Sequence, residues 1–149
     1  MKASISWLKS LCPTERSAAQ IVSDLTMAGL EVDAIEPAAH PFTQVVIGQI
    51  TDMSPHPNAD KLNVCQVSDG QSSYQVVCGA ANARPGLKAP FAQVGGSVGP
   101  EFQIQEAELR GVTSSGMLCG ADELGLSDER DGLMELPDDA PVGMDFKTY

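Results

Sequence analysis

A succession of short β-prone runs between Val45 and Leu109 constrains the fold of this chain more than any other feature of the sequence. The turn-forming pairs Asp69-Gly70 and Gly95-Gly96 separate some of these runs and favour reversals of the chain. Consecutive antiparallel pairing of such strands predicts a mainly β fold, a small closed barrel of five strands. The predicted strands are Val45 to Met53, Leu62 to Ser68, Tyr74 to Cys78, Ala89 to Val94 and Phe102 to Leu109.

The first part of the chain has a different periodicity, that of short helices. Apolar residues at spacings of three and four predict one helix over 5–11 and a second from Glu15 to Ala28. Thr14 can cap the second helix, and Gly29 stands where a left-handed residue commonly ends one. The segment from Leu30 to Ala34 then alternates apolar and acidic residues, which predicts a half-buried strand.

Prolines mark the boundary between these two parts. The segment from Pro37 to Pro41 is interpreted as a linker, so residues 1–41 and 42–149 are predicted to belong to separate domains. Beyond Arg110 the sequence becomes rich in loop-forming residues, with a short helix predicted over 121–124 and a last strand over 133–136. Neither a membrane-spanning run nor a secretory signal is evident, so we expect a cytoplasmic chain that does not enter membranes.

The loop over 54–62 is the first candidate for a binding function. Its two prolines stiffen the chain, and Asn58 and Asp60 can hydrogen-bond their own backbone. Lys61 is then free to meet a phosphate at the rim of the predicted barrel. The alternative, that His56, Asn58 and Asp60 only close the turn, is equally well supported by the sequence.

Two further stretches combine glycine with hydrogen-bond donors. The stretch 110–119 contains Arg110, three hydroxyl residues and two glycines, which suits contacts to phosphate or sugar oxygens. Within it, Met117 and Leu118 are expected to anchor the loop in the core, and a plain glycine turn is the alternative interpretation. The stretch 77–84 leaves a strand at a glycine and presents Asn82 and Arg84.

No catalytic or metal centre is predicted. The phosphate-binding P-loop, the nucleophile elbow of hydrolases and the zinc-protease motif are all missing from the sequence. The four cysteines form no C-x-x-C pair, and two isolated histidines are too few to complete a metal site with them. The acidic run over 122–131 lacks the register of a calcium-binding loop, so we interpret it as a solvated surface.

The motifs His-Pro-Asn-Ala-Asp-Lys-Leu over 56–62 and Arg-Gly-x-x-Ser-x-Gly-Met-Leu-Cys over 110–119 occur together with Gly-Leu-Glu-Val-Asp over 29–33. In this order and spacing they resemble the N-terminal region of bacterial phenylalanyl-tRNA synthetase (phenylalanine–tRNA ligase) β subunits. The resemblance covers essentially the whole chain. It implies that residues 42–149 form a tRNA-binding OB-fold barrel inserted in a small split α+β element. Residues 1–41 would be the first half of that element, and the chain would be truncated before the second half.

The resemblance also implies a function. Intact enzymes of this family are α2β2 tetramers that join phenylalanine to its tRNA with ATP and Mg²⁺, and the amino-acid site lies on the α subunit. This chain would then be a non-catalytic accessory module without a cofactor of its own, next to the rest of the β subunit. The tRNA-binding residues implied by the motifs are Asn58, Asp60, Lys61, Asn82, Arg110, Ser114, Gly116 and Met117, to which we add the nearby cations Arg84 and Lys88.

The charge of the chain argues for weak binding. The formal net charge is −11, and fifteen acidic residues but only six basic ones lie from Phe42 onward. With at most four cations near the candidate loops, log K should fall against log salt with a slope no steeper than roughly −3.5, without base preference. Two alternatives stay open at this point: a free-standing tRNA-binding OB protein, and a protein-docking or spacer domain that has lost its affinity for RNA.

Overall fold

The computed structural model describes residues 1–149 as two compact units, Met1–Pro37 and Ala38–Tyr149. The first unit contains the helices α1 (Ile5–Leu11) and α2 (Ala18–Met27), and the second contains all of the strands. No helix in the chain combines the length and the apolar character needed to cross a membrane.

The two helices of the first unit are confirmed, but α2 begins three residues later than Glu15. Thr14 is not its cap. The Ser17 hydroxyl accepts the Gln20 backbone N–H while the Gln20 side chain accepts the Ser17 N–H, a complete capping box. At the other end Gly29 adopts a φ of +91°, and the Leu30 N–H donates to the Leu25 carbonyl at 2.9 Å. This is the Schellman arrangement that glycine permits.

The strand predicted from Leu30 to Ala34 is wrong for this chain, because the segment has no regular secondary structure. A strand is defined by hydrogen bonds to a neighbour, and no ladder pairs with this segment. Neither helix contains a buried residue, so apolar side chains such as Trp7 and Met27 remain exposed.

We expect Leu25→Asp in α2 to leave the melting transition of the second unit unchanged. The physical reason is that the core clusters of the barrel consist of residues of the second unit alone, and Leu25 belongs to the first. Its effect should instead fall on self-association, since exposed apolar surface promotes it. Calorimetry together with sedimentation at several concentrations measures both. A lowered barrel transition would show that the two units share one core.

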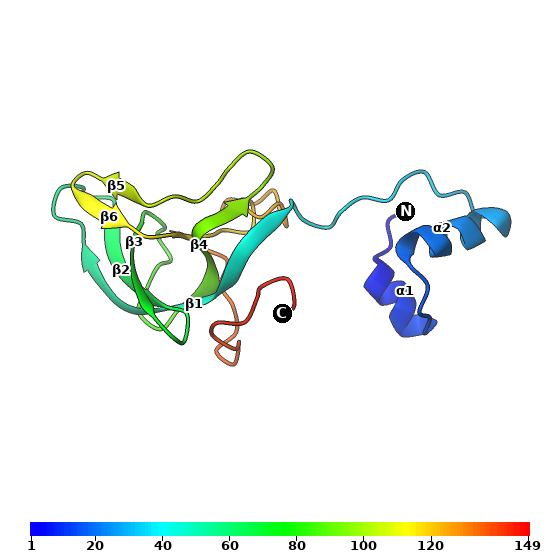
Figure 1. The fold of residues 1–149 in the computed structure, drawn as a ribbon, viewed down its shortest axis with the longest axis horizontal. Coiled ribbons are helices and arrows are strands. Elements are labelled where there is room, and N and C mark those ends of the chain that lie inside the picture. Colours follow the sequence, from blue (N-terminus) through cyan, green and yellow to red (C-terminus); the bar gives the residue numbers. More distant parts are fainter. The chain divides into compact units, whose positions relative to one another are not determined.

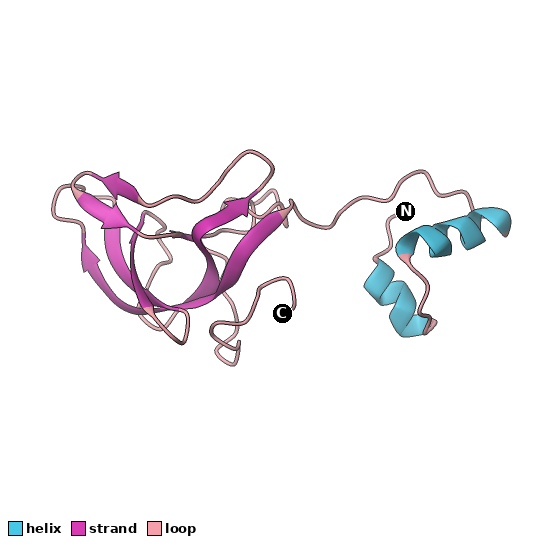
Figure 2. Cartoon of the chain, viewed as in Figure 1, coloured by secondary structure: helices cyan, strands magenta, loops and turns pink.

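The second unit is built on a five-stranded antiparallel sheet that curls into a half-closed barrel (Figures 1 and 2). Its strands, in the spatial order β3-β2-β1-β4-β7, are β1 (Phe42–Pro55), β2 (Asn63–Ser68), β3 (Ser73–Cys78), β4 (Lys88–Val98) and β7 (Met117–Leu118). A separate two-stranded hairpin consists of β5 (Ala107–Leu109) and β6 (Val112–Ser114). The mainly β class and the OB-like five-stranded sheet are therefore confirmed.

Strand β1 explains the curl. Its first half, through Gln49, pairs with β4, whereas its second half, from Gln49 to Pro55, pairs with β2. A bulge between Ile50 and Asp52 accompanies the change of partner, and bulges bend strands in this way. The predicted consecutive pairing is thus wrong for β4, which pairs with β1 instead of β3.

The predicted fifth strand is also corrected. Of Phe102 to Leu109, only the last three residues form a strand, and this strand turns back on β6. The hydrogen bonds to β3 are made instead by residues at the end of β6 and just after it. The Ser115 N–H donates to the Gln75 carbonyl at 2.8 Å, and the Ser114 hydroxyl accepts the Val77 N–H at 3.0 Å.

The barrel core centres on Phe91, which is fully buried in β4 and lies 5.3 Å from the Tyr74 ring, centroid to centroid. Two glycines give this ring its space. A Cβ atom at Gly116 would stand 2.5 Å from Cε2 of Phe91, and a Cβ at Gly48 would stand 2.7 Å from its Cβ. The other large side chains with no exposure include Ile47, Ile50, Val67, Val76 and Leu124.

The segment 121–149 packs on the barrel with little regular structure. The predicted helix over 121–124 is a set of turns, and the predicted strand over 133–136 makes only a single bridge, between Leu136 and Lys88. Side chains of the barrel form hydrogen bonds with the backbone of this segment, so it does not need the partners that a regular helix or strand would supply.

Candidate nucleic-acid interface

The loop between β1 and β2 and the turn between β5 and β6 meet at one rim of the barrel. The Asn58 side-chain amide donates to the Arg110 carbonyl at 3.0 Å, and the Arg110 guanidinium reaches back to the Asn58 carbonyl at 3.4 Å. Asn58, Asp60, Lys61 and Arg110 are all exposed. We refer to these four residues as the rim site.

Arg110 has an unusual backbone conformation. It forms a two-residue turn with Gly111, and their φ values of +51° and +84° are typical of a type I′ hairpin turn. A left-handed conformation costs a non-glycine residue about 1–2 kcal/mol. The hydrogen bond from Asn58 stabilises this turn from outside.

The rim site carries two cations that no carboxylate neutralises at close range. The structure contains four ion pairs, and neither Lys61 nor Arg110 takes part in any of them. Both residues lie in short, hydrogen-bonded connections, so the backbone positions from which their side chains project are restricted before any ligand arrives. Such an arrangement suits binding of phosphate oxygens.

Three other predicted residues lie elsewhere and bind the segment 133–140. Asn82 accepts the Leu133 N–H and donates to the Leu133 carbonyl, both at 2.9 Å, as a strand neighbour would. Arg84 forms a two-pronged ion pair with Glu135, whose pKa is lowered to about 2 by hydrogen bonds from Arg84 and Asn82. The Lys88 ammonium donates to the carbonyls of Asp138 and Ala140, at 2.5 and 2.8 Å.

The remaining predicted residues make contacts inside the barrel. Ser114 is buried, and its hydroxyl donates to the Gly116 carbonyl while it accepts the Val77 N–H. Gly116 adopts a φ of +135° against the Phe91 ring, and Met117 is half-buried in β7. Direct contact of these residues, and of Asn82, Arg84 and Lys88, with tRNA stays a prediction.

The sequence analysis named His56 only as one of three residues that could close the turn and did not place it among the tRNA-binding residues. The imidazole is only 5% exposed and uses both ring nitrogens within the chain. A histidine between two prolines in a polar loop was a signal for a structural role, but its partner Leu109 lies 53 residues away in the sequence.

The cysteines of the barrel are buried thiols. Cys65 and Cys119 are fully buried, Cys78 is 8% exposed, and burial raises the pKa of Cys119 to about 12. The neighbouring Cys65 thiol lowers the pKa of Cys78, and the pKa of Cys65 is raised in turn. No group of three or more His, Cys, Asp or Glu side chains is arranged to hold a metal ion.

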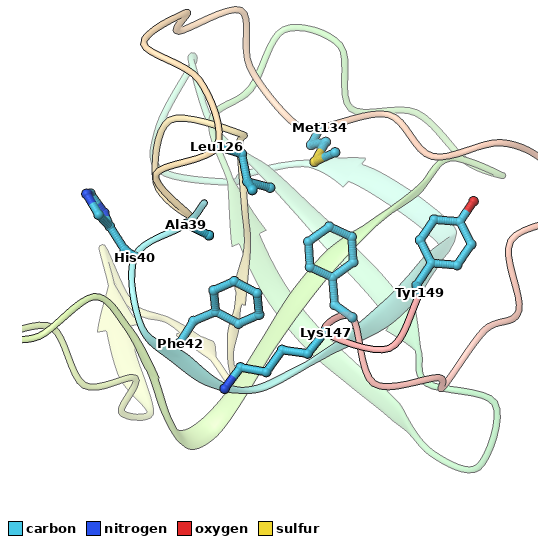
Figure 3. Close-up of a pocket in the computed structure, with 8 residues that line it drawn as sticks. Ala39, His40, Phe42, Leu126, Met134, Lys147 and Tyr149 are labelled. Atoms are coloured by element: carbon cyan, nitrogen blue, oxygen red, sulfur yellow. The ribbon is translucent and has the colours of Figure 1, made fainter. Parts of the chain in front are cut away.

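A cavity of about 460 Å³ lies on another part of the second unit (Figure 3). Its walls are mainly apolar and include Phe42, Leu126, Met134 and Tyr149. The Phe146 ring lies between two of them, 6.0 Å from Phe42 and 6.4 Å from Tyr149, centroid to centroid. This cavity contains none of the residues selected from the sequence.

Comparison with known proteins gives a consistent result. Residues 45–145 match the family described as "Putative tRNA binding domain". Over its full length the chain is 54% identical to the phenylalanine–tRNA ligase β subunit of Pseudomonas putida and 51% identical to that of Hahella chejuensis. It spans 19% of the length of each of these relatives. A methionyl-tRNA synthetase related protein from Pyrococcus horikoshii shares the fold, with a TM-score of 0.50 and 24% identity over 68% of this chain and 86% of that one.

Proposed function

Because this chain belongs to the putative tRNA-binding domain family, we propose that it is a tRNA-binding module that grips the tRNA backbone through its rim site. The resemblance to phenylalanine–tRNA ligase β subunits, predicted from the sequence motifs, is confirmed along all 149 residues. These relatives are ligase subunits by name, so the module would serve aminoacylation without a catalytic centre of its own.

One observation carries this proposal: two unpaired cations, Lys61 and Arg110, stand on restrained connections at the same rim. Contacts from cations to phosphates position a nucleic acid but carry no sequence information. The fifteen acidic residues from Phe42 onward repel the backbone at longer range. Binding should therefore be weak and directed at backbone and shape.

We extend the same proposal to the surroundings of the module. The first unit would be the beginning of a split α+β domain, and the barrel its insertion. The complete β subunit would assemble with an α subunit as an α2β2 tetramer in the cytoplasm, where ATP and Mg²⁺ would be used at a site outside this chain.

A tRNA titration at several salt concentrations tests the proposed function. If only Lys61 and Arg110 meet phosphates, the slope of log K against log salt should be about −1.4 to −1.8. It should not approach the roughly −3.5 that four cations would give, because Arg84 and Lys88 are engaged inside the chain.

Variants make this test specific. Lys61→Ala and Arg110→Ala should each reduce the steepness by about 0.7 to 0.9, and Lys147→Ala, a matched cation outside the rim site, should leave it unchanged. The net charge of −11 favours a second candidate function, a protein-docking or spacer domain. If the wild-type chain shows no tRNA binding even at low salt, the proposed tRNA-binding function is wrong and the docking or spacer function replaces it.

A further inference from the structure

We infer that His56 is a positioning residue of the rim site: its imidazole, neutral and protonated on Nε2, holds the turn that aims Arg110 at RNA. The inference rests on the proposed function and goes beyond it, since it assigns a role to a side chain that is only 5% exposed.

The hydrogen bonds define the state of the ring. Nδ1 lies 3.0 Å from the Asn58 backbone N–H, which can only donate, so Nδ1 must accept and carries no proton. Nε2 lies 2.8 Å from the Leu109 carbonyl oxygen, which can only accept, so Nε2 must carry the proton. A charged imidazole would place a donor against the Asn58 donor, and the other neutral tautomer would break both bonds.

The two partners of the ring show what it positions. The carbonyl of Leu109 immediately precedes Arg110, and Asn58, whose N–H binds the ring, holds the carbonyl of Arg110 itself at 3.0 Å. The left-handed residue is thus fixed by consecutive carbonyls, one bound to His56 and the next to Asn58. Lys61, in contrast, has no bond to this turn.

Because the hydrogen bonds of His56 reach the Arg110 turn but not Lys61, a positioning role and a packing role of His56 predict different results. If His56 acts through Arg110, its loss should matter for RNA only while Arg110 is present. If it only fills space, its loss should lower stability and affect Lys61 and Arg110 alike. A double-mutant cycle distinguishes the two, since residues that act together give non-additive effects.

The experiment uses the full 149-residue chain and a tRNA-Phe transcript at fixed low salt. His56→Phe keeps an aromatic ring, somewhat larger than imidazole, and removes both bonds. We expect it to weaken binding by the same factor as Arg110→Ala, to reduce the salt slope by about 0.7 to 0.9, and to have no further effect in the Arg110→Ala background. In the Lys61→Ala background the two losses should multiply.

Two conservative variants protect the test against simple unfolding. In His56→Gln the amide nitrogen can replace Nε2 and donate to Leu109, whereas in His56→Asn the amide oxygen can replace Nδ1 and accept from Asn58. Gln should rescue more of the affinity and salt slope than Asn, because the Leu109 carbonyl adjoins Arg110. The melting transition of each variant is recorded alongside.

Nitrogen-15 NMR of the free wild-type chain at pH 7.5 gives a readout without RNA. A protonated Nε2 and a bare Nδ1 are expected; any other state of His56 would overturn the inference. It is also overturned if wild-type binding is intact but His56→Phe acts equally in the Arg110→Ala and Lys61→Ala backgrounds. No binding by the wild-type chain would overturn the proposed function, and the inference with it.

Discussion

Gly116→Ala is expected to lower the free energy of unfolding of the barrel by about 3 to 5 kcal/mol, through overpacking and backbone strain combined. A Cβ atom at this position would stand 2.5 Å from Cε2 of Phe91 and 2.8 Å from the Ala92 carbonyl oxygen. Phe91 is fully buried and cannot move aside, and the φ of +135° at Gly116 strains any L side chain.

Denaturant unfolding measures this effect, and Gly99→Ala provides a matched control. Gly99 also has a positive φ, +104°, but a Cβ there meets nothing within 4 Å. Gly99→Ala should therefore lower the free energy of unfolding only through backbone strain, by about 1–2 kcal/mol. Equal effects of the two substitutions would show that the contact with Phe91 is not what requires glycine at position 116.

Lys88→Met is expected to lower the free energy of unfolding of the barrel by about 2 to 3 kcal/mol, which is the range for hydrogen bonds made by charged groups. The ammonium of Lys88 binds the carbonyls of Asp138 and Ala140. Ala140 is itself buried against Ile47 and Leu136, so the bonds fix a small core as well as a chain segment. Methionine keeps the length of the apolar stem but cannot donate.

Thermal unfolding of Lys88→Met, with Lys147→Met as the exposed control, tests this interpretation. The tRNA salt slope should not change in the folded Lys88 variant. The opposite pattern, unchanged stability with a slope reduced by about 0.7 to 0.9, would return Lys88 to the set of phosphate contacts.

The first four strands of the barrel could be predicted from the sequence, because alternation and turn residues are local signals. The consecutive pairing of β1, β2 and β3 could be predicted too, but the pairing of β4 could not. Nothing in the β4 sequence indicates that its partner is the first half of β1, because the bulged strand that changes partners is recognised only in three dimensions. The segment from Leu30 to Ala34 shows the same limit, since alternation without a neighbouring strand leaves the chain irregular.

The candidate site divides in the same way. The motifs brought the loop over 56–62 and Arg110 to attention, and the structure places them in contact. The sequence could not show that Asn82, Arg84 and Lys88 are engaged within the chain, because their partners lie about fifty residues further on. In a sequence, a cation whose partner is another part of the chain cannot be distinguished from one that binds a phosphate.

The distribution of the cysteines allows the two units of this chain to be followed separately by chemical labelling. Cys12 is exposed in the helical unit, whereas Cys65, Cys78 and Cys119 are buried in the barrel. An alkylating reagent applied to the native chain therefore labels the exposed Cys12 first, and the fully buried Cys65 and Cys119 react only as the barrel opens. Mass spectrometry of labelled chains can then follow opening of the barrel separately from the helices, without any engineered probe.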